Sequence, residues 1–443
     1  MAVLDQSESE KKLFSGLIIT LGISMLMPEF IAPFFIFGLY IHFMKQFKAT
    51  NRKAKMKDIG KVFFAYTIFM AASAIWSSEH LMSFLIGMLW MGCMLGYILL
   101  ANIITTEDKL KNAITALNIS TGIIGLISIL EFSTYNLTKN FEWFNFLFPN
   151  PFYWHLNKYI FDIIPIDIIN YIFASRSSAT FDNPLILSTY LVTAIPFCAF
   201  GSVYFKQSKH RKINRICLVL GIGGLVGTSS RAGFIAVALS IFIMLFSNKK
   251  ILKKMWFILV ALVVGLPIGL LTRYKNLSFA DFLNSDSQRI GIWKSCFDMW
   301  LHKPILGLGA GTEPIHQQLL NNYDIPRTHA HNLFLEMLVE GGIIGGAFVI
   351  AIIALIVKSL VKILKLKNGK YRAYGITYIA SLIAFTVASM TEFTLQSAKE
   401  LMMMFFLLGF IEATRRLAMD ENQTIDIAYE KTEDKEAVTN EIG

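Results

Sequence analysis

The stretch THAHNLFLEMLVEGG, residues 328–342, interrupts a chain that is 54% hydrophobic and only 16% charged. It contains two histidines, an asparagine and two glutamates: His329, His331, Asn332, Glu336 and Glu340. A histidine titrates near neutral pH, so it can take a proton from a hydroxyl group without help from a metal. The stretch therefore predicts acid–base chemistry on a hydroxyl-bearing substrate.

His331 directly precedes the apolar run LFLEMLV and is the predicted general base. One alternative is a structural histidine that caps the following helix by hydrogen bonding. A second is a zinc site with His329, but His-x-His with no third His or Cys nearby is an incomplete ligand set. We therefore predict no metal.

Glu336 and Glu340 are four residues apart and so share one face of a helix. Either carboxylate can orient His331. Glu340 is followed by two glycines, however, and can also simply mark a helix break. Both interpretations stay open at this level.

Three arginines are candidates for binding an anion: Arg176, Arg231 and Arg289. Arg231 lies in VGTSSRAGFIAV, at the tip of a hairpin whose apolar segments, 216–229 and 232–247, span roughly 21 to 24 Å at 1.5 Å per residue. That is shorter than the hydrocarbon core of about 30 Å, so the tip lies below the membrane surface. A guanidinium there is unfavourable unless it faces a cavity or binds an anion, and its planar fork matches phosphate oxygens. The alternative is that Arg231 snorkels or pairs with an acidic neighbour or helix carbonyls.

Arg289, in NSDSQRIGIWKSCFDMW, is predicted at the start of an amphipathic helix with Ile290, Trp293 and Phe297 on one side. A plain surface role is the alternative. Arg176, in RSSATFDNP, precedes an apolar segment, where an external arginine is common.

The elements that must position these residues are membrane-spanning helices, because a soluble protein of 443 residues needs about a quarter charged residues. We predict an all-α polytopic membrane protein with twelve crossings, of which the first two can instead form a re-entrant hairpin. The crossings are residues 13–27, 30–44, 62–77, 81–103, 114–133, 185–205, 216–229, 232–247, 256–272, 341–361, 373–391 and 400–414.

The net charge of +10 comes from basic linkers between these crossings, which indicates a topology signal rather than a nucleic-acid partner. A cytoplasmic N-terminus places most Lys and Arg residues inside, both termini in the cytoplasm and all the candidate residues outside. The four cysteines have no CxxC spacing, so neither an external disulfide nor a cysteine metal site is expected.

Two external loops, about 134–184 and 273–340, are longer than the other connections, as functional loops usually are. The aromatic-rich segment 151–173 suits a helix in the membrane interface. We predict a transmembrane catalytic domain over 1–419 and an acidic, disordered cytoplasmic tail over 420–443.

The order and external placement of TSSRAG, RIGIWKSCFDMWLHKPILGLGAG and HNLFLEMLVEGG resemble the O-antigen ligase and polymerase superfamily of bacterial envelope enzymes. That family has a Thr/Ser-Arg hairpin, an Arg-x-x-x-Trp helix leading to Pro-x-x-Gly-x-Gly, and His-Asn-x-x-Leu-x-x-x-x-Glu-x-Gly. The resemblance covers about residues 176–412, and hydropathy alone matches the N-terminal third.

The resemblance implies a GT-C-like membrane glycosyltransferase that uses no metal or cofactor. The donor would be a glycan on a polyprenyl diphosphate at the outer face of the bacterial inner membrane, and the acceptor a hydroxyl of another glycan or of the lipid A core. Arg231 and Arg289, with Arg176, would hold the diphosphate, and His331 would deprotonate the acceptor in an inverting displacement. His329, Asn332, Glu336 and Glu340 would support the site, and the doubled histidine leaves open which imidazole is the base.

Two other classes of membrane protein fit the sequence less well. A transporter or flippase of lipid-linked saccharides usually has ionisable groups at the bilayer midplane and two related halves, and neither is visible in this sequence. A cell-wall polymerase of the shape and division type shares the donor but lacks the His-Asn block. Sequence does not separate a ligase from a polymerase, because the two share the donor and differ in the acceptor.

Overall fold

The structure is a computed structural model, and it describes residues 2–29, 31–50, 54, 56–138, 176–247, 279–366 and 369–441. Within these residues the chain is helical and contains no strand. The α-helices are α1 (Ala2–Ile23), α2 (Ala32–Ala49), α3 (Asp58–Ala72), α4 (His80–Ile103), α5 (Glu107–Thr138), α9 (Pro184–Tyr204), α10 (Ser208–Thr228), α11 (Arg231–Ser247), α13 (Phe279–His302), α14 (Thr312–Tyr323), α15 (Leu333–Lys365), α16 (Gly369–Ser389) and α17 (Ala398–Glu441). Single 3₁₀ turns occur at Ser24–Leu26, Ser73–Ile75 and Thr394–Gln396.

Every predicted crossing that falls on described residues is a helix, whereas the segments 256–272 and 151–173 lie outside them. Among the described helices, five are long and apolar enough to span a membrane: Asp58–Ile75, His80–Ile103, Glu107–Thr134, Pro184–Tyr204 and Leu333–Lys365. Arg231–Ser247 is a shorter apolar helix. The chain is thus a helical membrane protein, and the count of twelve crossings stays a prediction.

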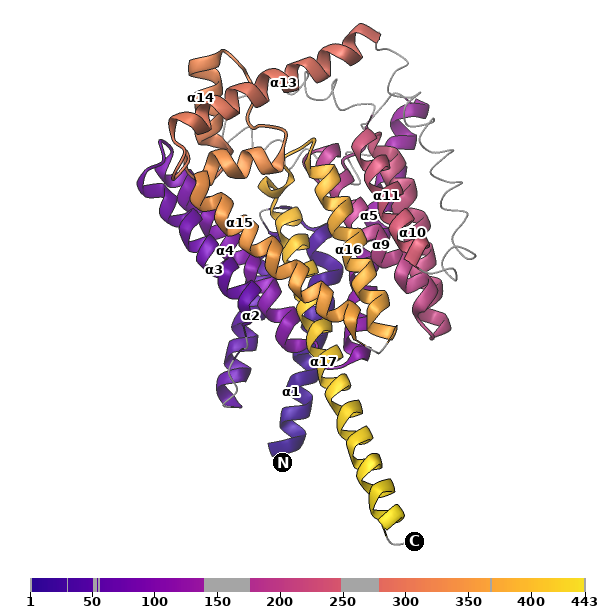
Figure 1. The fold of residues 1–443 in the computed structure, drawn as a ribbon. Helices are drawn as coiled ribbons and strands as arrows, with labels where there is room; N and C mark the ends of the chain where they lie inside the picture. The colour runs from indigo at the N-terminus through magenta and orange to yellow at the C-terminus, as the bar shows by residue number, and fades with distance from the viewer. Residues whose placement is uncertain are drawn as a thin grey trace.

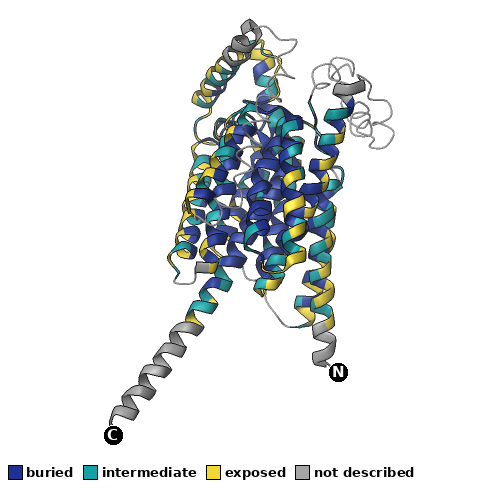
Figure 2. Cartoon of the chain, turned by 90° about the vertical axis from the view of Figure 1, so that its right-hand side faces the viewer, coloured by how far each residue is buried: buried dark blue, intermediate teal, exposed yellow. Residues whose placement is uncertain are grey.

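Helix α9 occupies the centre of the bundle, with 94% of its most apolar window buried. It is apolar on every side, as expected for a helix surrounded by other helices. Beside it, α5 and α10 approach closely through small residues, since a Cβ on Gly224 would lie 2.6 Å from the Cα of Gly125. Figure 2 shows the resulting core of buried residues along the middle of the bundle.

The two chain ends lie together at one end of the bundle, and α13 and α14 lie at the opposite end, which we call the site end (Figure 1). Two extents differ from the sequence prediction. Helix α13 begins ten residues before Arg289 instead of at it, and α17 continues to Glu441, where a disordered tail was predicted from residue 420.

Helix α15 is interrupted at Gly342, whose backbone is non-helical with φ of 59°. The Pro-x-x-Gly-x-Gly segment packs against this interruption and bonds to it through the backbone: Leu308 N–H to Val339 O at 2.9 Å, Gly309 N–H to Glu340 O at 3.0 Å, and Ile343 N–H to Pro304 O at 2.8 Å. A Cβ on Gly342 would lie 2.4 Å from the carbonyl oxygen of Ile305, so only glycine fits here. The structure thus has the helix break that was one of the two interpretations of Glu340 and its glycines, and the break fixes the first turns of α15 at the site end.

Candidate active site

His331 lies in the short segment before α15, where it adopts a left-handed conformation with φ of 51°. The capping position belongs to the next residue, Asn332, whose Oδ1 accepts from the N–H groups of Phe334 and Leu335, each at 3.1 Å. The His331 side chain is therefore free of the capping role considered as an alternative, and it turns toward α16.

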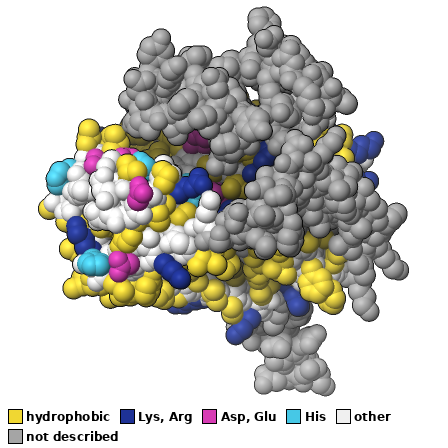
Figure 3. All heavy atoms as spheres, turned by 90° about the horizontal axis from the view of Figure 1, so that it is seen from above, with side chains coloured by type: hydrophobic (Ala, Val, Ile, Leu, Met, Phe, Trp, Pro, Cys, Tyr) yellow, Lys and Arg dark blue, Asp and Glu magenta, His cyan; other side chains and the backbone are white. Residues whose placement is uncertain are grey.

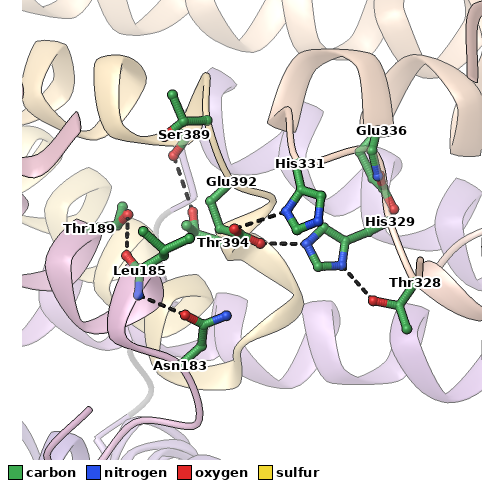
Figure 4. Close-up of polar contacts among 12 residues, drawn as sticks. Asn183, Leu185, Thr189, Thr328, His329, His331, Glu336, Ser389, Glu392 and Thr394 are labelled. Atoms are coloured by element: carbon green, nitrogen blue, oxygen red, sulfur yellow. Dashed lines mark hydrogen bonds and ion pairs between the residues drawn. The ribbon is translucent and has the colours of Figure 1, made fainter. Parts of the chain in front are cut away.

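The partner of His331 is Glu392, in the loop that joins α16 to α17. Nδ1 of His331 lies 3.0 Å from Oε2 of Glu392, and Nε2 of His329 lies 2.5 Å from Oε1 of the same carboxylate (Figure 4). The carboxylate is only 1% exposed, whereas the His331 side chain is 22% exposed. One buried carboxylate thus binds both histidines of the His-x-His motif.

The protonation states follow from this geometry. Burial alone would raise the pKa of Glu392, but the charge and hydrogen bond of His329 and those of His331 outweigh it and hold that pKa well below its usual range. Burial lowers the pKa of His331, partly offset by Glu392, and the charges of His329 and Arg289 lower it further. Glu392 is thus ionised while His331 is neutral at neutral pH. Because Nδ1 donates to the carboxylate, Nε2 of His331 carries the lone pair that a general base needs.

Arg289 lies near this pair on α13. Its charge acts on His331, and one turn later Trp293 donates its Nε1–H to the carbonyl of Ala330 at 2.9 Å. The indole therefore ties α13 to the backbone between the two histidines. The charge of Arg289 and the hydrogen bond of Trp293 thus link α13 to the segment that carries His331.

Arg176 is fastened to the hairpin that carries Arg231. Its Nε donates to the carbonyl of Thr228 at 2.8 Å, and the N–H of Ser177 bonds to the carbonyl of Gly227 at 2.9 Å. Glu131 of α5 holds the same segment by accepting from Ser177 Oγ at 2.6 Å, Ala179 N–H at 2.7 Å and Ser178 N–H at 3.1 Å. The structure thus places Arg176 beside the turn that leads into Arg231.

Arg231 begins α11, which packs along α16. The last residue of α16, Ser389, is three residues before Glu392. Figure 3 looks onto the site end and shows Lys and Arg side chains near Asp, Glu and His side chains, in the part that the grey residues leave uncovered.

Glu336 and Glu340 are both buried and both bind backbone N–H groups. Glu336 accepts from Ala330 at 2.5 Å, and Glu340 accepts from Gly311 at 3.1 Å. They brace the segment before α15 and the turn before α14. The residue that bonds to His331 is instead Glu392, which was not among the residues predicted for the site.

The structure supplies the third metal-ligating group that the sequence lacked, because ligand atoms of His329, His331 and Glu392 lie within 4.8 Å of one another. Their separations of 2.5 and 3.0 Å are hydrogen-bond lengths, whereas ligands around a zinc ion with bonds of about 2.0–2.2 Å stand farther apart. We therefore describe the cluster as hydrogen-bonded. All four cysteines are described, free and buried.

Residues 216–350 match the family model described as O-antigen ligase. The predicted resemblance to the O-antigen ligase and polymerase superfamily is confirmed. The matched region carries Arg231, Arg289 and His331, whereas Arg176 and Glu392 lie outside it. The chain is also similar to the ComP-specific O-oligosaccharyltransferase of Acinetobacter baylyi (strain ATCC 33305 / BD413 / ADP1), with 26% identity over 249 residues. That alignment covers 53% of this chain and 44% of the relative, so it spans less than half of the relative's length.

Proposed function

We propose that this protein transfers a glycan from a polyprenyl diphosphate carrier to an acceptor hydroxyl on the external face of the bacterial inner membrane. The observation that carries the proposal is the His331–Glu392 pair beside Arg289, because His331 and Arg289 both lie within the region that matches the O-antigen ligase family. The acceptor is a glycan or the lipid A core. Both termini are cytoplasmic, and the site end faces outward.

In the proposed reaction Nε2 of His331 accepts the proton of the acceptor hydroxyl as its oxygen attacks the anomeric carbon. The bond from that carbon to the diphosphate oxygen breaks in the same displacement, which inverts the configuration. Glu392 stabilises the imidazolium that forms on His331. The departing polyprenyl diphosphate carries the negative charge, which Arg231, Arg289 and Arg176 neutralise, and such electrostatic stabilisation is commonly the largest catalytic contribution. No step of this reaction uses a metal or cofactor.

An apolar groove supports a donor with a lipid chain. The groove has a volume of about 530 Å³ and lies between α3, α15, α16 and α17. Leu333, Phe334 and Leu395 line it near the site end, so it is lined there by residues two to three positions from His331 and Glu392. On α15 the lining residues continue as far as Leu364.

The length of the groove favours a polyprenyl chain. From Val349 to Leu364 the residues of α15 that line the groove span roughly 23 Å at 1.5 Å per residue, most of the thickness of the hydrocarbon core, and Leu333, Phe334 and Met337 extend the lining toward the site end. An ordinary acyl chain reaches only through its own leaflet. We therefore assign the groove to the polyprenyl chain of the donor, whose diphosphate would then lie at the arginines of the site end.

A reconstituted transfer assay tests this function. The full chain in proteoliposomes receives a glycan on polyprenyl diphosphate together with a saccharide acceptor, and both released polyprenyl diphosphate and new glycosidic product are measured. We expect both from the wild type. Absence of both with every saccharide and lipid A core acceptor would overturn the proposed function.

A pair of variants on one helix tests the groove. Val357 lines the groove and is 52% exposed, whereas Ile350 is 70% exposed and is not among the lining residues. Val357→Trp should raise KM for a long-chain donor several-fold and affect a donor with a shortened chain less. Ile350→Trp should leave both values unchanged, and equal behaviour of the two variants would refute the assignment of the groove.

A further inference from the structure

His329 is bound through both of its ring nitrogens. Its side chain is 8% exposed, its Nε2 lies 2.5 Å from Oε1 of Glu392, and its Nδ1 lies 2.8 Å from Oγ1 of Thr328 (Figure 4). The His329 and His331 rings stand 4.2 Å apart between centroids. His329 therefore contacts the carboxylate on the oxygen that His331 leaves open.

The chemistry of the carboxylate fixes the direction of these hydrogen bonds. An ionised carboxylate only accepts, so Nε2 of His329 must carry a hydrogen and donate it to Glu392. In the neutral imidazole Nδ1 is then an acceptor, and the Thr328 hydroxyl donates to it. The chain of donors thus runs from Thr328 to His329 to Glu392, while His331 donates to the same carboxylate from the other side.

We propose that His329 is a positioning residue for glycan transfer: it holds Oε1 of Glu392, so that Oε2 meets Nδ1 of His331 and the base nitrogen faces the acceptor. This inference rests on the proposed function and answers which histidine is the base. His331 keeps Nε2 for the acceptor and is the more exposed of the two, whereas both nitrogens of His329 are occupied.

Hydrogen bonds hold the backbone next to His329 in place. Ala330, between the two histidines, is fully buried and is held on both sides, because its N–H donates to Glu336 and its carbonyl accepts from Trp293. Among the described residues, the charged groups that act on this segment are Glu392 of the α16–α17 loop, Arg289 of α13 and Glu336 of α15. The two rings therefore approach Glu392 from a fixed backbone.

Two substitutions at residue 329 separate the hydrogen bond from the volume of the ring. In His329→Gln the amide N–H reaches about as far as Nε2 and can still donate to Glu392, whereas His329→Leu fills similar space without a donor. We expect His329→Leu to lower kcat at least 10-fold with little change in KM for the donor. His329→Gln should stay within about 3-fold of the wild type.

The pH profile gives a readout that a purely structural role would not change. In its protonated form, at acid pH, His329 lowers the pKa of His331 through its charge, and neither Leu nor Gln carries a charge, so both variants should move the acid limb of the kcat profile to higher pH. Thr328→Val removes the hydroxyl that bonds to Nδ1 of His329 but leaves the bond to Glu392, so it should lower kcat less than His329→Leu does. The melting temperature of each variant is measured alongside, so that loss of folding is recognised.

Three results would overturn the inference. They are a His329→Leu variant with wild-type kcat, equal loss in the Leu and Gln variants at unchanged melting temperature, and inactivation of the wild type by a chelator with recovery on adding Zn²⁺. The last result would show that the cluster holds a metal. If the wild type forms product and any of these three results is found, the inference about His329 is wrong but the proposed function still holds. If the wild type forms no product, both the inference and the proposed function are wrong.

Discussion

Glu392→Gln tests the link between the buried carboxylate and His331. The substitution keeps the size of the side chain but replaces the carboxylate by a neutral amide. It therefore removes the negative charge that stabilises the imidazolium of His331. Hydrogen bonds to charged groups contribute about 1.5–3 kcal/mol and neutral ones about 0.5–1.5 kcal/mol, so the loss is about 1–2 kcal/mol in the transition state. At 1.36 kcal/mol per factor of ten, this lowers kcat about 5- to 30-fold.

The pH dependence of Glu392→Gln has a definite sign. Glu392 raises the pKa of His331 against burial, which lowers it below its ordinary value of 6.5. Only neutral His331 acts as a base, so wild-type activity is full above this lowered pKa and is lost as the pH falls through it. Without the carboxylate the pKa falls further, so the acid limb of the variant moves to lower pH.

The assay is steady-state glycan transfer in proteoliposomes across the acid pH range, with the wild type and Glu392→Gln reconstituted at equal density. KM for the donor should stay within about 2-fold, because Glu392 binds the histidines and not the donor. An unchanged kcat, or an acid limb that stays in place, would refute the role of Glu392.

Three further substitutions give different outcomes. Arg231→Lys replaces a planar fork by a point charge, so KM for the donor should rise about 10-fold with a smaller change in kcat; an unchanged KM would contradict diphosphate binding. Gly342→Ala places a Cβ 2.4 Å from the Ile305 carbonyl at positive φ and should destabilise the protein by about 1–3 kcal/mol, whereas Gly346→Ala, with its nearest atom at 3.8 Å, should not lower the melting temperature. Glu131→Ala removes an acceptor from three donors around Ser177 and should lower stability by about 2–4 kcal/mol and weaken donor binding; a stable variant with wild-type KM would show that this segment does not hold Arg176 in place.

The helices could be predicted from the sequence because few backbone conformations are stable inside a membrane. Long apolar runs must satisfy their backbone hydrogen bonds internally, so each described run forms a helix. The break near Gly342 was also readable, since paired glycines after Glu340 interrupt an otherwise continuous helical pattern. His331 could also be placed just before α15, because the apolar run LFLEMLV follows it closely.

The partner of His331 could not be read from the sequence. Glu392 is a single acidic residue 61 positions further along the chain, in a short loop with no motif of its own. Its contact arises because α15 and α16 bring their site ends together, and periodicity within one helix does not report which loops meet. Glu336 and Glu340 are conspicuous through their spacing, but their carboxylates bind backbone N–H groups, that of Ala330 before α15 and that of Gly311 before α14.

A single-turnover measurement with His331→Ala tests the central claim most directly. Proteoliposomes loaded with a limiting amount of lipid-linked glycan donor are mixed with saturating acceptor, and release of polyprenyl diphosphate is followed over time. A general base contributes about 10²–10⁴-fold, so the variant should bind the donor normally and release it at least 100-fold more slowly than the wild type. A single-turnover rate within a few-fold of the wild type would contradict the assignment of His331 as the base.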